Sequence, residues 1–171
     1  DVLSVLGLSQ SLGMTSSGPS ELPPEFVDRF RAILDEPHFA SCIDSFGESR
    51  ATTFRTNELK TDADSLRCEL EAEGFTPRPI PWKPDAFEVP PGQRNQLTRA
   101  AASSEGRLYI QNPSSMIPPL VLDPKSDEWI LDLTAAPGSK TMQLAEMMGN
   151  AGRISAVESV RGRFFRLRAN L

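Results

Sequence analysis

Cysteine and histidine are scarce in this sequence, and each scarcity excludes a class of site. The 171 residues include two cysteines, Cys42 and Cys68, and one histidine, His38. Two cysteines provide neither a disulfide scaffold nor a four-ligand zinc site, so we expect no metal and a reducing, cytoplasmic environment. No stretch approaches the roughly 18 apolar residues of a membrane-spanning helix, so we also expect no contact with a membrane.

Basic residues are outnumbered by acidic ones, 18 to 23, and the resulting net charge of −5 by itself argues against a nucleic-acid partner. The distribution of charge changes that interpretation. Residues 1–75 contain 6 basic and 14 acidic residues, whereas residues 76–171 contain 12 basic and 9 acidic ones. Residues 151–171 contain five arginines and one acidic residue, Glu158. Two alternatives follow: a polyanion contacts the C-terminal half, or the arginines cover a solvated helix face.

The first 106 residues predict a leader, a small domain and a connector. Residues 1–20 are rich in serine and glycine, which predicts a disordered leader. Residues 21–92 predict an α+β domain, and residues 93–106 a polar connector with a short helix. The elements expected in the domain are helices over 24–35, 39–46 and 61–74, a strand over 51–56 and an extended, proline-rich segment over 75–87.

Residues 107–171 alternate between strand and helix patterns. The elements expected are strands over 107–111, 129–133 and 154–157, the second of them buried, and helices over 116–122, 140–148 and 160–171. Strand–helix–strand order with short links predicts a parallel α/β sheet. Two parallel strands cannot cover their own faces. The expected fold class is therefore α/β: a small α+β domain followed by the start of a doubly wound domain, truncated from a longer protein.

The loop after the strand over 129–133 has the pattern of a nucleoside site. Small residues lead into the start of a helix, where free N–H groups can donate hydrogen bonds to a ligand. Glu158 follows the next strand, a position at which an acidic residue accepts hydrogen bonds from ribose hydroxyls. A phosphate-binding P-loop requires glycine where Thr134 and Ser139 stand, and Gly138 alone cannot make the dinucleotide pattern. A nucleoside cofactor without pyrophosphate remains, namely S-adenosylmethionine. The alternative is a strand–turn–helix without a ligand.

Four segments then resemble one enzyme family. Residues 132–141 closely resemble the first motif of the Sun/Nop2 family of RNA cytosine-5 methyltransferases. Residues 54–61 are similar to the family's Arg-x-Asn-Thr-Leu-Lys signature, and residues 109–119 to its Gln-x-x-Ser-Met-x-Pro segment. Glu158 and Arg163 match its acidic second motif and the arginine that follows. The resemblance keeps the family's order over about residues 22–171.

The resemblance implies a Rossmann-like methyltransferase domain that binds S-adenosylmethionine and methylates carbon 5 of cytosine in RNA. Backbone of the loop and Lys140 would hold the methionine end, Glu158 would hold the ribose, and Arg163 either neighbours the cofactor or lies on a solvated helix face. The implied cofactor-binding residues are Thr134, Ala135, Ala136, Pro137, Gly138, Ser139, Lys140, Glu158 and Arg163.

In this family a cysteine thiolate adds to carbon 6 of the base, which makes carbon 5 nucleophilic. The cysteines that do this belong to later motifs, which are absent here, and neither Cys42 nor Cys68 matches them. We therefore expect no catalytic residue in this chain and no activity from the chain alone. For Arg55 and Lys60 the alternatives are contact with RNA and a place at a surface strand end, and we expect the surface strand end.

Gly138, Ser139 and Lys140 are similar to the bacterial small-subunit ribosomal RNA branch and also to some transfer RNA branches. Ribosomal RNA is the expected partner. Transfer RNA, or the role of a non-catalytic RNA-binding scaffold, is the alternative.

Overall fold

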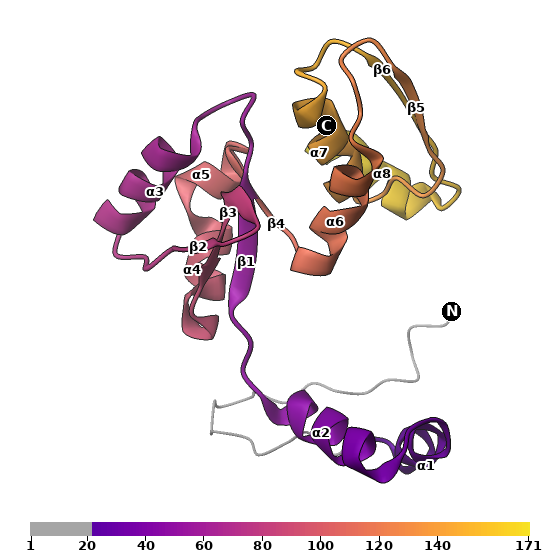
Figure 1. Ribbon diagram of the computed structural model, residues 1–171. Coiled ribbons are helices and arrows are strands. Elements are labelled where there is room, and N and C mark those ends of the chain that lie inside the picture. The colour runs from indigo at the N-terminus through magenta and orange to yellow at the C-terminus, as the bar shows by residue number, and fades with distance from the viewer. Residues whose placement is uncertain (1–21) are drawn as a thin grey trace, which may run out of the picture. The chain divides into compact units, whose positions relative to one another are not determined.

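The computed structural model describes residues 22–171, so the expected leader over 1–20 lies outside the described residues. The chain divides into two compact units between Ser49 and Arg50, and Figure 1 shows the elements of each. No helix within residues 22–171 is long and apolar enough to cross a membrane.

The first unit is a pair of helices, α1 (Pro24–Ile33) and α2 (Glu36–Gly47). Pro24 occupies the first helical position, where its missing N–H costs nothing. Asp35 caps α2 by accepting a hydrogen bond from the backbone N–H of His38 at 3.1 Å. Phe30 packs against both Phe26 and Phe39, with ring centroids 5.3 and 6.3 Å apart. The two helices expected from the sequence are confirmed.

The second unit begins with an antiparallel sheet in the order β2-β3-β1-β4. Its strands are β1 (Thr52–Thr56), β2 (Arg78–Ile80), β3 (Lys83–Val89) and β4 (Leu108–Ile110). Its helices are α3 (Ala63–Ala72), the 3-10 turn η1 (Pro91–Gln93), α4 (Arg94–Arg99) and α5 (Ala101–Ser104). Phe54, Leu66, Leu70, Phe87 and Leu97 join in one buried core, so α3, α4 and α5 cover one face of the sheet (Figure 1).

This sheet differs from the domain division expected from the sequence. Residues 93–106 were expected to form a polar connector, but Leu97 and Ala102 are fully buried in the core of the sheet. The strand expected at the start of the second domain, β4, pairs with β1, with Phe54 opposite Ile110. Pairing between residues more than 50 positions apart leaves no local pattern in a sequence, which is why the periodicity indicated a boundary here.

The α/β part of the second unit follows in the expected order. Its elements are α6 (Pro113–Leu122), β5 (Trp129–Asp132), α7 (Ser139–Met147), β6 (Arg153–Ala156) and α8 (Arg161–Asn170). β5 and β6 are parallel, with Trp129 opposite Arg153 and Asp132 opposite Ala156. The strand–helix–strand prediction is confirmed.

The prediction that the strand over 129–133 is buried is wrong. Trp129, Leu131 and Leu133 are 73%, 59% and 66% exposed, whereas the alternate residue Ile130 is half-buried. Successive side chains of a strand point to opposite faces, so one face of β5 is covered and the other is open to solvent. An apolar run predicts burial only where both faces of the sheet are covered.

Candidate cofactor site

Asp132, the last residue of β5, ties the two ends of the following loop together. Its Oδ1 accepts a hydrogen bond from the backbone N–H of Thr134 at 3.2 Å, and its Oδ2 accepts one from the hydroxyl of Thr141 at 2.7 Å. The backbone N–H of Ala135 donates to the carbonyl of Val157, just after β6, at 3.0 Å. The loop is thus fixed at the carboxyl ends of both parallel strands, where α/β sheets bind ligands.

Gly138 makes the turn from the loop into α7. Its φ is +110°, in the left-handed region, and its N–H donates to the carbonyl of Ala135 at 2.7 Å. A Cβ at this position would lie 3.3 Å from Cδ1 of Leu167, so the space beside it is already filled. In the part of the chain that the structure describes, no side chain caps the start of α7. The first N–H groups of α7 therefore remain free to bind a ligand.

Two side chains of helix α8 hold the loop by donating hydrogen bonds to its carbonyl groups. The guanidinium of Arg163 donates to the carbonyl of Ala136 at 2.8 Å, and the amide of Asn170 donates to the carbonyl of Pro137 at 2.7 Å. The side chains of Ala135 and Ala136 are buried against Leu167. These two alanines therefore shape the loop by packing, and their side chains are not available to a cofactor.

Glu158 and Arg163 lie together beside the loop. The side chain of Glu158 is 3% exposed. Its Oε1 accepts a hydrogen bond from the backbone N–H of Val160 at 2.8 Å, and its Oε2 lies 3.4 Å from the guanidinium of Arg163. The distance between Oε2 and Arg163 is longer than an ordinary hydrogen bond, so Oε2 retains the capacity to accept a hydrogen bond from a hydroxyl group. Because Arg163 also binds Ala136, the structure brings the predicted acidic residue to the predicted loop.

Lys140 lines a cavity of about 200 Å³ between α6, β5 and the start of α7. Leu133 and Pro119 are among the other lining residues. Thr134 and Pro137 are exposed at the loop, and Ser139 is half-buried. Among the described residues, no group of three or more histidine, cysteine or acidic side chains is arranged to hold a metal.

The sequence interpretation missed three residues that fix the loop. Asp132 lies in the quoted motif, and its place at a strand end was a signal that could have identified it. Asn170 carries no such signal, because its contact with Pro137 depends on how α8 packs. Arg55 was expected at a surface strand end, but its side chain is fully buried and donates to the carbonyl of Ser139 at 3.2 Å. That expectation is wrong, because position 55 faces α7 and not solvent.

Two family profiles match the chain in sequence order. The family described as the N-terminal domain of 16S rRNA methyltransferase RsmF matches residues 22–113. The family described as 16S rRNA methyltransferase RsmB/F matches residues 119–171. The second match includes the loop, Glu158 and Arg163.

Individual relatives agree with these matches. Ribosomal RNA small subunit methyltransferase F from Shewanella oneidensis is 39% identical over 158 residues, which cover 88% of this chain and 32% of the relative. The chain thus spans about a third of the length of that relative. A methyltransferase homologue from Pyrococcus horikoshii is 31% identical with a TM-score of 0.70, covering 88% of this chain and 53% of that one.

A second solved structure shares the fold at lower identity. NSun6 from Pyrococcus horikoshii, determined with SFG, has a TM-score of 0.77 at 18% identity, covering 86% of this chain and 62% of that one.

Proposed function

Because this chain belongs to the RsmF family of 16S rRNA methyltransferases, we propose that the whole protein transfers a methyl group from S-adenosylmethionine to carbon 5 of a cytosine in 16S ribosomal RNA. The observation that carries this proposal is the loop from Asp132 to Thr141, held at the carboxyl ends of two parallel strands within the matched region. An enzyme of ribosomal RNA works where ribosomes are, which is the ground for proposing a cytoplasmic location.

The residues around the loop fit S-adenosylmethionine, which supplies an electrophilic methyl group when bound. The uncapped N–H groups at the start of α7 and the ammonium of Lys140 suit the carboxylate of its methionine part. Oε2 of Glu158 suits a ribose hydroxyl. Arg163 supports both by holding Ala136 and facing Glu158. Residues 134–138 complete the proposed cofactor site as the framework that holds these groups in place, because the N–H groups of Thr134, Ala135 and Gly138 are already bonded within the protein.

The nucleophile for this reaction does not belong to the residues around the loop. Cys42 is half-buried on α2 and Cys68 is exposed on α3, and both precede the loop in the sequence. Thiolate character requires a positive or polar environment, and neither cysteine takes part in the site described. We therefore propose that the 171-residue chain alone transfers no methyl group.

The test is a methyl-transfer assay with labelled S-adenosylmethionine, comparing the whole protein with the 171-residue chain. The substrates are unmodified 16S ribosomal RNA and, in parallel, unmodified transfer RNA. We expect label on carbon 5 of cytosine in 16S ribosomal RNA with the whole protein, and none with the chain alone. Label on transfer RNA alone would show that transfer RNA, and not 16S ribosomal RNA, is the substrate. A whole protein that binds RNA but transfers no label would be a non-catalytic scaffold. Label transferred by the chain alone would contradict the placement of the nucleophile.

A further inference from the structure

A fully buried arginine links the antiparallel sheet to the start of α7. Arg55 is the fourth of the five residues of β1, between Phe54 and Thr56, and its side chain is 0% exposed. Phe54 points into the core under α3, α4 and α5, so Arg55 points to the opposite face of the sheet. A guanidinium removed from water is strongly destabilising unless acceptors surround it.

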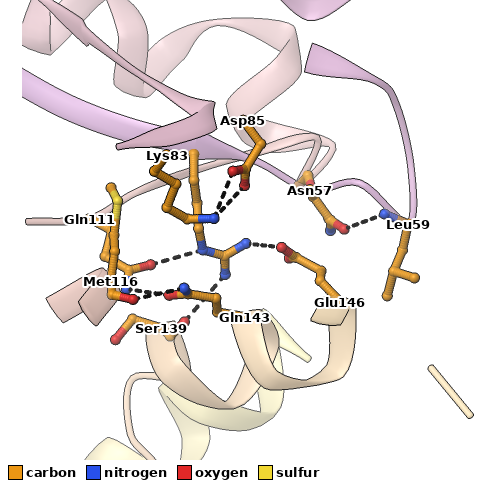
Figure 2. Close-up of polar contacts among 11 residues, drawn as sticks. Asn57, Leu59, Lys83, Asp85, Gln111, Met116, Ser139, Gln143 and Glu146 are labelled. Atoms are coloured by element: carbon orange, nitrogen blue, oxygen red, sulfur yellow. Dashed lines mark hydrogen bonds and ion pairs between the residues drawn. The ribbon is translucent and has the colours of Figure 1, made fainter. Parts of the chain in front are cut away.

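The acceptors of Arg55 come from segments far away in the sequence. Its Nε donates to Oε1 of Gln111 at 2.9 Å, its Nη2 donates to the carbonyl of Ser139 at 3.2 Å, and its Nη1 donates to the carboxylate of Glu146. Figure 2 labels these three acceptor residues and marks the hydrogen bonds as dashed lines. The planar guanidinium of Arg55 thus binds a carbonyl in the first turn of α7 and, two turns later, the carboxylate of Glu146 near the other end of the same helix.

Ser139, Gln143 and Glu146 form one polar stripe along α7, because residues at this spacing share a helix face. Gln143 accepts from Nε2 of Gln111 at 3.2 Å and donates to the carbonyl of Met116 at 2.9 Å. The side chain of Glu146 is 5% exposed, and this burial raises the pKa of its carboxyl group although Arg55 acts in the opposite direction. The stripe is held by directional hydrogen bonds, which fix both the rotation of α7 and its position along its axis.

Next to this stripe, Lys83 and Asp85 of β3 pair with each other at 2.7 Å (Figure 2). Both side chains are largely buried. Asp85 raises the pKa of Glu146, and Lys83 lowers it. Because the charges of Lys83 and Asp85 compensate each other, the positive charge that balances Glu146 is that of Arg55, which contacts its carboxylate directly.

We propose that Arg55 is a positioning residue for the cofactor loop, so that the antiparallel sheet sets the place of the N–H groups that begin α7. This inference rests on the proposed function for its purpose, since the loop is the site proposed for S-adenosylmethionine. Its geometry is independent of the cofactor. Ser139 follows Gly138 directly, so a shift of the Ser139 carbonyl displaces the turn into the helix. A lysine cannot replace the arginine, because its single ammonium cannot bind three acceptors in one plane.

The test compares Arg55→Lys with Arg107→Lys. Arg107 also forms a forked ion pair, donating to both oxygens of Glu69 and to Glu105, but all its partners precede residue 112. The readout is hydrogen–deuterium exchange in the 171-residue chain at three amides whose hydrogen bonds define the loop, those of Ala135, Gly138 and Met142. We expect Arg55→Lys to accelerate their exchange by about tenfold or more and Arg107→Lys to leave it unchanged.

Two further measurements keep the test decisive. If Arg55→Lys fails to fold, Glu146→Gln takes its place, since it weakens the same contact while keeping the shape; we expect the same three amides to exchange faster. In the whole protein, Arg55→Lys should raise KM for the cofactor about five- to tenfold with little change in kcat, as expected when only binding is weakened.

Unchanged exchange at these amides in both Arg55→Lys and Glu146→Gln overturns the positioning role, as does an equal acceleration in Arg107→Lys. Faster exchange in a protein that binds no S-adenosylmethionine overturns the proposed function and leaves the positioning role standing.

Discussion

The carboxylate of Glu158 faces two groups of its own chain, the backbone N–H of Val160 and the guanidinium of Arg163. Its proposed ribose contact is therefore coupled to the start of α8. The contact with Val160 spans two residues and resembles the one that Asn112 makes with the N–H of Ser114 at 3.0 Å, at the start of α6. A comparison of the two positions separates a loss of helix capping from a loss of cofactor binding.

We expect Glu158→Ala to weaken S-adenosylmethionine binding to the whole protein by about 1.5–3 kcal/mol, because a charge-assisted hydrogen bond is lost. Titration calorimetry measures the change. Asn112→Ala serves as the control, since it removes a similar side-chain contact at a helix start without touching the loop. Unchanged affinity in Glu158→Ala, or an equal loss in Asn112→Ala, would remove Glu158 from the site.

Single residues also show where inference from the sequence ends. Glu158 and Gly138 were singled out because an acidic residue after a strand and a glycine turn have local patterns, whereas Arg163 was named from the family resemblance alone. Arg55 was misjudged because a basic residue in a β-branched stretch is typical of a surface strand. Its burial depends on Gln111 and Glu146, which lie 56 and 91 positions away. The motif over residues 54–61 includes Arg55, but the partners of its side chain depend on the three-dimensional fold.

At the scale of elements, the start of α7 shows why a glycine stands at position 138. The sequence predicted a turn and a helix start there. The structure adds two reasons for the glycine, its φ of +110° and the close approach of Leu167. Gly149, at the other end of α7, has a φ of +59° but nothing within 4 Å of the place where a Cβ would stand. The two glycines therefore differ in crowding while sharing a left-handed backbone.

We expect Gly149→Ala to lower the free energy of unfolding by about 1–2 kcal/mol, the usual cost of a left-handed backbone for alanine. Gly138→Ala should cost more, because Leu167 must also move, and it should weaken cofactor binding as the loop shifts. Urea unfolding of the 171-residue chain measures the first effect, and calorimetry on the whole protein measures the second. Equal losses of stability with unchanged affinity in both variants would show that the crowding at Gly138 has no role.

At the scale of the whole molecule, local patterns predicted the elements better than their grouping. The parallel strands and the helix between them followed from periodicity alone. The break between Ser49 and Arg50 and the pairing of β4 with β1 did not. Grouping depends on contacts between distant segments, such as Phe54 opposite Ile110, and short strands leave little information about their partners. The family resemblance supplied the order of the segments, but it did not supply their sheet.

The charge asymmetry between the two halves of the chain predicts how RNA affinity responds to salt. Four arginines lie along α8: Arg161, Arg163, Arg166 and Arg168. Arg163 binds the loop, and Arg161 and Arg168 lie 5.7 and 5.4 Å from the ring of Phe165. All four are exposed at the residue level. Arg163 is paired with Glu158, so the charges available to phosphate groups are those of the other three. Each phosphate contact releases a counterion and makes binding weaker as salt increases.

We expect the affinity of the whole protein for 16S ribosomal RNA to fall steeply with salt. The variant Arg166→Gln/Arg168→Gln should reduce the slope of log affinity against log salt by about 1–2, because each contact to single-stranded RNA contributes about 0.7. Arg67→Gln is the control: Arg67 lies on α3 in the acidic half and already pairs with Asp64 and Glu71. Fluorescence anisotropy across a salt series measures the slopes. Affinity that stays constant across the series, or the same reduction in Arg67→Gln, would show that the arginines of α8 cover a solvated helix face and bind no phosphate.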